Sequence, residues 1–381
     1  MVPNGWTLNN FNSVAELIHG FQFREHHFSE SGVPIVKIAS ISHLRGVSLE
    51  KCSYISEELA SEFSKYQIEA GDVLMALTGG TLGKTCKVQE DIELCLQNYR
   101  VGNFKPKPNF LDKDFLYYFL ISFTVQKRIE NIVNEAAQPN VGKADFDKIK
   151  VLTPPLPEQR KIAKILSTWD KAISNIERLI GNSKLQKKAL MQQLLNGKKR
   201  LLDESGKEFK GDWIETKLGD VLKIGGGKDY KHLSEGNVPV YGSGGHMLYV
   251  SDYLYDGESV CIGRKGTIDQ PMFLSGKFWT VDTLFYTHSF KNTIPKFIYQ
   301  YFLTIHWRRY SEASGVPSLS KSIIEKIKIK LPPLIEQQKI AQVLTNADKE
   351  IELLEQQLAD LKQEKKALMQ QLITGKRRVK V

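Results

Sequence analysis

The clearest chemical pattern in the sequence is an apparent phosphate-binding loop, TGGTLGKT at residues 78–85. A nucleotide-binding loop of this type needs four residues between its first glycine and the Gly-Lys pair, so that backbone N–H groups surround the phosphates. Only three residues separate Gly79 from Gly83. The spacing therefore argues against ATP binding, and it favours a tight turn between two strands.

Other catalytic patterns are also missing from the sequence. It contains no Asn/Asp-Pro-Pro-Tyr/Phe motif of the kind found in amino-methyltransferases, and its eight histidines and four cysteines show no metal-ligand spacing. We therefore expect that this chain is not an enzyme and binds neither a metal nor a cofactor. The alternative is an enzyme whose active site these patterns do not reveal.

Polar and basic side chains beside glycines and aromatic rings suggest contact with DNA. Lysine binds phosphate, whereas Asn, Gln and Arg can form paired hydrogen bonds with base edges. Residues 225–232, 241–246 and 264–269 have this composition. For any single residue, an ordinary solvated loop is the alternative interpretation. The candidate DNA-binding residues are Lys84, Asn98, Tyr99, Arg100, Lys228, Tyr230, Lys231, His246, Arg264 and Lys265.

An internal repeat organises the elements that must position these residues. PPLPEQRKIA at residues 154–163 returns 178 residues later as PPLIEQQKIA, and KKALMQQL occurs identically at 187–194 and 365–372. A repeat with a fixed offset indicates duplicated structural units. Each copy is predicted to form one long helix, because the proline pair must precede a helix and Gly197 and Gly375 are stop signals.

Apolar residues in both copies recur at alternating steps of four and three, which specifies a left-handed coiled coil. Polar residues at Ser183, Lys187 and Lys365 interrupt this seam and are expected to fix its register. The alternative is two amphipathic helices that each pack on their own domain. The predicted seam and partner-docking residues are Ile162, Leu166, Trp169, Ile173, Ile176, Ile180, Leu190 and Leu194 in the first copy, and Ile340, Leu344, Ala347, Ile351, Leu354, Leu358, Leu361, Leu368 and Leu372 in the second.

The segments before the two helices resemble one another more weakly. GDVL at 71–74 and GESV at 257–260 are each followed by a Gly-Thr turn, and FLY at 115–117 matches FIY at 297–299. Short strands such as residues 33–38, with one helix near 113–133, predict mixed α/β globules. The predicted domain order is globule 1–153, helix 154–200, globule 201–331 and helix 332–381.

The linker between the copies limits how the helices pair. A helix of about 43 residues is about 65 Å long, while the linker from Gly197 to Trp213 spans at most about 55 Å. Antiparallel pairing needs no return of the chain, whereas parallel pairing strains the linker. We therefore expect an α+β fold with two similar globular heads, an intramolecular antiparallel coiled coil and approximate two-fold symmetry. Such an arrangement suits a protein that contacts two separated DNA sites.

The composition is that of a globular protein, with 41% hydrophobic and 25% charged residues. No apolar run approaches the ~20 residues that a membrane helix needs, so we expect a cytoplasmic protein without membrane contact. The net charge is +10, but residues 154–200 alone hold 11 Lys and Arg against three acidic residues. The two predicted globules are nearly neutral, so net charge alone does not establish DNA binding by them.

The repeated PPLxEQxKIA and KKALMQQL motifs resemble those of the DNA-specificity subunits of bacterial type I restriction–modification systems, and the resemblance covers the full length. It implies that each globule is a target-recognition domain for one half of a bipartite site in double-stranded DNA. It also implies that the helices set the spacing and dock two methyltransferase subunits, with motor-nuclease subunits joining the endonuclease complex. ATP, Mg²⁺ and S-adenosylmethionine would then bind to those partners. A coiled-coil scaffold without DNA contact is the second alternative.

Overall fold

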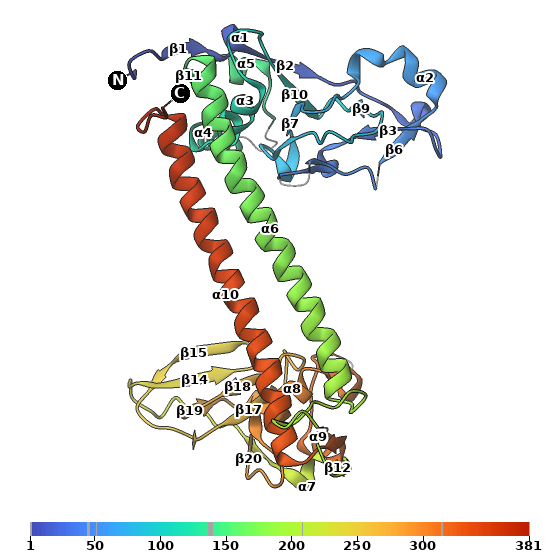
Figure 1. Cartoon of the computed structure of the whole chain (residues 1–381), viewed down its shortest axis with the longest axis vertical. Coiled ribbons are helices and arrows are strands. Elements are labelled where there is room, and N and C mark those ends of the chain that lie inside the picture. Colours follow the sequence, from blue (N-terminus) through green and yellow to red (C-terminus); the bar gives the residue numbers. More distant parts are fainter. Residues whose placement is uncertain are drawn as a thin grey trace. The chain divides into compact units, whose positions relative to one another are not determined.

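The computed structural model describes residues 2–43, 46–50, 52–135, 140–207, 209–313 and 315–380. The chain divides into two compact units, one made of residues 1–178 with 356–381 and the other of residues 179–355 (Figure 1). Each unit combines a globular head with segments of two long helices. We call the globular part of the first unit the first head and that of the second unit the second head.

The first head is built on a four-stranded antiparallel sheet of order β2-β10-β7-β8, beside a three-stranded sheet of order β6-β3-β9 in which β3 and β9 are parallel. Its strands are β1 Thr7–Asn10, β2 Ala15–His19, β3 Val33–Val36, β4 Ile41–Ser42, β5 Gly46–Val47, β6 Ser53–Ile55, β7 Val73–Ala76, β8 Thr85–Lys87, β9 Leu96–Gln97, β10 Val101–Pro106 and β11 Lys150–Thr153. The predicted strand at 33–38 is shorter, because a 3₁₀ turn begins at Ile38.

The helices of the first head are α1 Phe11–Val14, α2 Glu57–Glu62, α3 Lys113–Leu120, α4 Phe123–Glu135 and α5 Lys143–Asp147. Helices α1, α3, α4 and α5 pack on the side of the four-stranded sheet of the first head, whereas α2 packs with the three-stranded sheet. The single helix predicted near 113–133 is therefore wrong, since α3 and α4 are separate helices. The break falls where the wholly buried run from Phe115 to Leu120 meets the exposed Phe123, and a change of direction keeps that ring at the surface.

The second head repeats this topology. Its four-stranded sheet has the order β13-β20-β17-β18, and a neighbouring sheet of order β15-β14-β19-β16 again contains one parallel pair, β14 with β19. This correspondence confirms the prediction of two similar heads. The strands are β12 Ile214–Lys217, β13 Lys223–Gly226, β14 Val238–Gly242, β15 Gly245–Val250, β16 Tyr255–Asp256, β17 Ser259–Gly263, β18 Met272–Leu274, β19 Lys277–Thr280, β20 Leu284–His288 and β21 Lys328–Leu331, and the helices are α7 Leu218–Val221, α8 Pro295–Phe302 and α9 Lys321–Lys326.

The long helices α6 Leu156–Leu194 and α10 Leu334–Ile373 fall within the two predicted helical segments. The predicted stop glycines follow the helix ends within three residues, and Gly197 and Gly375 have φ of +66° and +69°, a left-handed conformation that favours glycine. The domain boundaries themselves remain a prediction. No helix in the described part of the chain is both long and apolar enough to span a membrane.

Ion pairs show that the helical segments run antiparallel within each unit. In the first unit, Asp170 contacts Lys365 at 2.5 Å, and the pair Glu177–Lys362 is 2.8 Å apart. In the second unit, Lys187 contacts Asp348 and Lys184 contacts Glu355. The pairs of the second unit lie at the repeat-equivalent positions of those in the first.

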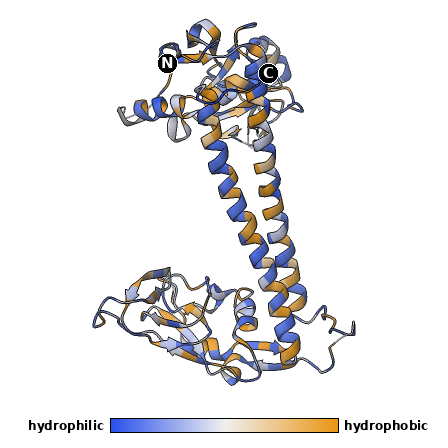
Figure 2. Ribbon diagram, turned by 60° about the vertical axis from the view of Figure 1, so that its left-hand side comes forward, coloured by the Kyte–Doolittle hydropathy of each residue, from blue (hydrophilic) through white to orange (hydrophobic). Residues whose placement is uncertain are grey.

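The predicted seam residues are all buried or half-buried, which is the pattern expected for a coiled coil. Leucines off the seam, such as Leu185 and Leu353, are exposed. The colouring in Figure 2 shows hydrophobic residues running as stripes along both helices, with hydrophilic residues on the remaining surface. The seam ends are part of the head cores, since Leu166 and Leu372 join the first core and Leu344 and Leu194 join the second.

The repeated Glu-Gln pair at the start of each long helix attaches the head to the helix. Gln159 is fully buried; its amide nitrogen donates to the carbonyls of Phe110 and Pro154, and its oxygen accepts from the backbone of Asp112 at 2.7 Å. Gln337 makes the same kind of bonds in the second head. These hydrogen bonds fix the loop that leads into α3 or α8.

The neighbouring glutamates hold the end of the other helix. Glu158 accepts two hydrogen bonds from Arg378 and one from the Trp6 indole, and Glu336 accepts two from Arg200. Burial acts to raise the pKa of Glu158, but the hydrogen bonds from Arg378 and Trp6 outweigh it and hold this pKa below its ordinary value. Arg200 and Arg378, which follow the two long helices, are therefore structural.

We predict that Gln159→Ala destabilises the chain by about 2–4 kcal/mol, because it leaves buried backbone groups without hydrogen-bond partners. Gln337→Ala should cost a similar amount in the second head. Urea denaturation of the purified chain measures both effects. Gln186→Ala, at an exposed position of α6, is the control and should change the free energy of unfolding by less than about 0.5 kcal/mol. Equal stability of all three variants would contradict the attachment of the heads through Gln159 and Gln337.

Candidate nucleic-acid interface

The phosphate-loop-like segment of the first head connects β7 to the antiparallel strand β8. It contains a 3₁₀ turn over Gly79–Thr81, and Gly83 has a φ of +82°. The nucleotide-binding motif instead runs from a strand into a helix. The structure thus agrees with the strand-to-strand connection, although the eight intervening residues form a loop rather than a tight two-residue turn.

An open pocket of about 500 Å³ lies beside this loop. Lys84 is exposed at its edge, and His43 and Gln126 line it from neighbouring segments. The Gln126 amide donates to the carbonyls of Gly83 and Leu120, so that α4 supports the loop. Lys84 is therefore placed where a lysine can reach a phosphate.

Asn98, Tyr99 and Arg100 form the turn between β9 and β10. The side-chain oxygen of Asn98 accepts a hydrogen bond from the backbone N–H of Arg100, and only 7% of this residue is exposed. Arg100 donates to the Tyr99 hydroxyl at 2.8 Å and lies over its ring. The backbone of Leu77 donates to Arg100, which brings this turn beside the β7–β8 loop. Asn98 shapes the turn, while Arg100 is exposed.

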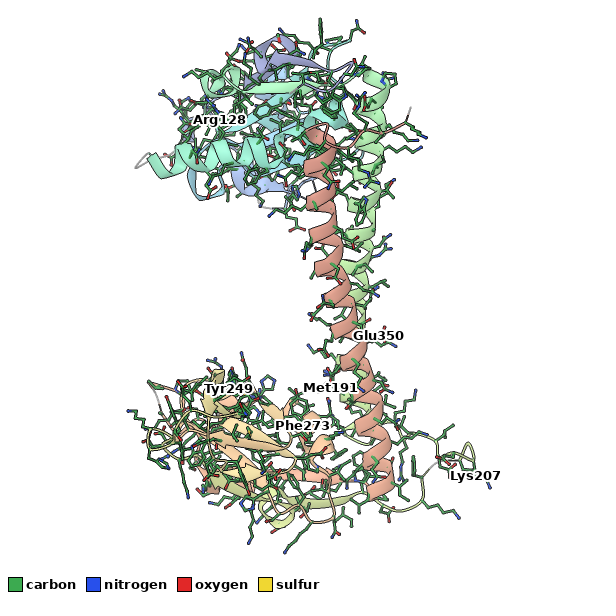
Figure 3. The ribbon with its side chains drawn as sticks, turned by 90° about the vertical axis from the view of Figure 1, so that its left-hand side faces the viewer. Arg128, Met191, Lys207, Tyr249, Phe273 and Glu350 are labelled. Atoms are coloured by element: carbon green, nitrogen blue, oxygen red, sulfur yellow. The ribbon has the colours of Figure 1, made fainter. Side chains whose placement is uncertain are left out.

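In the second head, the predicted stretches 241–246 and 264–269 lie against each other. A Cβ atom on Gly266 would lie 3.6 Å from Ser243, so the β17–β18 loop lies against the β14–β15 turn. His246 is exposed on β15, and its ring centroid is 4.6 Å from that of Tyr249. Figure 3 shows Tyr249 on this sheet and Phe273 on β18 of the neighbouring sheet. The hairpin and the loop thus form one polar and aromatic surface.

The other predicted residues of the second head flank that surface. The backbone of Lys228 accepts from the Trp279 indole and donates to Thr280, which attaches the segment to β19. Tyr230 is half-buried against the core of this sheet, whereas Lys228 and Lys231 are exposed. Their DNA contacts remain predictions.

Arg264 and Lys265 begin the β17–β18 loop and line a pocket together with Lys321, the first residue of α9. Lys321 was not predicted from the sequence, because it lies far along the chain from the glycine-rich stretches and its only signal is a lysine directly after the capping residue Ser320. In the described residues, no three His, Cys, Asp or Glu side chains are grouped so as to hold a metal ion.

Comparisons with known proteins agree on one family. The family model of the Type I restriction modification DNA specificity domain matches residues 3–182 and 210–363. The chain is 26% identical to the putative type I restriction enzyme MjaX specificity subunit of Methanocaldococcus jannaschii, over 100% of this chain and 95% of that protein. It is also 26% identical to the MjaVIII specificity subunit of the same organism, over 86% and 85%.

The fold is also found among solved structures. The crystal structure of the type I restriction–modification S subunit from M. genitalium matches with a TM-score of 0.64 and 18% identity, over 98% of each chain. A structure from work on the complex assembly and conformational transition of the type I R-M system matches with a TM-score of 0.62 and 17% identity. These likenesses concern the fold.

We predict that Asn98→Ala lowers the free energy of unfolding by about 1–3 kcal/mol, because it removes a buried acceptor. Lys84→Ala, at an exposed position, should leave stability within about 0.5 kcal/mol of wild type. Chemical denaturation measures both. If Asn98→Ala kept full stability while DNA affinity fell, Asn98 would be a base contact rather than a turn residue.

Proposed function

Because the chain belongs to the family of type I restriction–modification DNA specificity proteins, we propose that it reads a bipartite DNA sequence, one half with each head. The observation that carries this proposal is that the two heads share one strand order but differ in their loop residues. A shared scaffold with different surface loops suits two sites of different sequence.

The long helices then set the distance between the two half-sites. Support comes from the repeated ion pairs, which fix the antiparallel register of the helical segments within each unit. The tethers through Gln159 and Gln337 attach each head to its own long helix. A head held in this way moves with its helix, so a change in helix length changes where the head contacts DNA.

Identical exposed residues support docking of two copies of one partner. The octapeptide KKALMQQL includes Lys188, Ala189 and Gln192 in α6, all exposed, and their equivalents in α10 are identical and exposed as well. Packing does not require identity at surface positions. The same small surface is therefore presented twice, once in each unit, and we assign it to two methyltransferase subunits.

Catalysis in this proposal belongs to the partners. The methyltransferase subunits bind S-adenosylmethionine and methylate adenine, and motor-nuclease subunits use ATP and Mg²⁺ to cleave DNA. This chain supplies sequence recognition in the cytoplasm and contributes no catalytic residue. The spacing between Gly79 and Gly83 does not fit a nucleotide-binding loop, which supports the assignment of ATP binding to the partners.

We predict that Ala189→Arg removes one methyltransferase subunit from the co-purified complex, Ala367→Arg removes the other, and the double variant removes both. A bulky cation at the centre of a docking surface opposes binding by steric and charge effects. Native mass spectrometry of the co-expressed complex measures the stoichiometry.

Gln186→Arg is the matched control, because this exposed position differs between the two copies. It should leave two methyltransferase subunits bound. Two subunits retained by the double variant would place the docking surface elsewhere.

The length of the helices provides the direct test of the spacing proposal. We predict that four residues inserted after Arg178 in α6 change the accepted gap between the half-sites or abolish methylation, since the insertion rotates and shifts one head. Each half-sequence should stay the same. Sequencing the methylated sites in cells that also carry the methyltransferase gives both quantities.

A four-residue insertion after Ser205, in the connection that follows α6, is the control and should keep the original gap. A changed half-sequence after the α6 insertion would contradict the assignment of spacing to the helices. Methylation without any split motif would contradict the proposed function as a whole.

A further inference from the structure

Three cations converge on one pocket of the second head. The pocket has a volume of about 470 Å³ and is open to solvent. Arg264 and Lys265 reach it from the β17–β18 loop, and Lys321 reaches it from the start of α9. The remaining lining residues are Gly226, Phe285, Glu312, Ser318, Leu319 and Ser320.

Backbone hydrogen bonds hold the two basic segments side by side. The N–H of Arg264 donates to Thr283 at 2.7 Å, and its carbonyl accepts from Leu319 at 2.9 Å. Lys265 forms a backbone bridge with Ser318. These main-chain bonds join Arg264 and Lys265 to the segment 318–319, which leads into Lys321. The fold of the backbone therefore holds the three cations near one another.

The positive charges of this pocket are not neutralised internally. Over the described ranges, the Arg264, Lys265 and Lys321 side chains form no hydrogen bond or ion pair. Instead, Arg264 and Lys321 both lie over the Phe285 ring, at 6.0 and 5.9 Å from its centroid. The aromatic face orients the cations without cancelling their charge.

Two further observations indicate a positive field. Glu312 is the single acidic side chain among the pocket's lining residues. Next to the pocket, burial together with the charges of Lys223 and Lys321 lowers the pKa of His288. Unpaired cations in a concave site attract anions.

The described residues of the first head do not form this arrangement. By strand pairing, Leu77 and Thr78 of the first head occupy the positions of Arg264 and Lys265. Gly102 occupies the position of Phe285, since Gly102 pairs with His19 on β2 as Phe285 pairs with Gly226 on β13. Lys105 of the first head, by contrast, is paired with the buried Asp72 at 2.5 Å. Among the residues that the structure describes, the pocket is therefore a feature of the second head.

We propose that this pocket binds one phosphate of the DNA backbone, which anchors the second head beside its half-site. The inference rests on the proposed function and adds a distinct role for Arg264, Lys265 and Lys321 as phosphate contacts that position the head. Phosphate suits the site because a guanidinium, two ammonium groups and the nearby Ser318 and Ser320 are the donors that phosphate oxygens accept. Base edges are read by specific paired hydrogen bonds, which a shared cluster of cations does not provide.

The test measures binding of the complete chain, assembled with its methyltransferase partner, to duplexes containing the methylated motif. Arg264→Ala and Lys321→Ala should each weaken binding to all duplexes by a common factor of about 5–20 and reduce the salt slope by about one. The preference for the cognate duplex over one with a changed base should stay the same. Arg264→Lys should retain most of the affinity.

Lys143→Ala is the matched control, because Lys143 begins α5 in the first head as Lys321 begins α9 in the second. It should have less effect on affinity and salt slope. Thermal melting of each variant checks that the chain remains folded.

Three results would overturn the inference. A relaxed preference at one base pair would make Arg264 a base contact, and unchanged affinity with an unchanged salt slope would remove the phosphate contact. Calorimetric binding of inorganic phosphate that depends on Arg264, with duplex affinity unaffected, would assign the pocket to a free phosphate compound. If instead the wild-type complex bound all duplexes equally, the proposed function would fail, independently of this pocket.

Discussion

Two carboxylates at matched positions align the helices within each unit. Asp170 accepts from Lys365 on the opposite helix and from the Tyr118 hydroxyl of the first head at 2.7 Å. Asp348 accepts in the same way from Lys187 and from Gln300 of the second head. Each carboxylate therefore joins three elements. A half-buried ion pair contributes little net stability, but any other register leaves a desolvated charge without a partner, so the pair specifies alignment.

The sequence predicted those parts of the fold that repeat. The 178-residue offset, the proline and glycine limits and the apolar seam predicted both long helices, because these signals are local and periodic. The separate helices α3 and α4 were not predicted, since their break depends on which side of the segment meets the head core. Lys187 and Lys365 were recognised as polar breaks in the seam, but their partners lie more than 150 residues away and carry no local signal.

The candidate interface was predicted less completely, because residue type does not reveal whether a polar group is already used within the fold. Asn98 has the chemistry of a base contact, yet its oxygen binds the backbone of its own turn. Arg200 and Arg378 have the charge of phosphate contacts, yet both bind buried glutamates. Lys321 became a candidate only through its position beside Arg264, which depends on the folding of the chain. The net charge of the sequence therefore overstates the cations left to contact DNA.

The attachment of the heads has a consequence for how such proteins can evolve. Gln159 holds its head almost entirely through main-chain groups, the carbonyls of Phe110 and Pro154 and the N–H of Asp112. Gln337 likewise binds the carbonyls of Asn292 and Pro332, and its oxygen accepts from the N–H of Ile294 and from the Thr293 hydroxyl. An attachment made mainly through backbone groups depends little on the side chains around it. Mutation can therefore diversify the surface of either head while its attachment to the long helix stays intact. New specificities can then arise without changes in the helices.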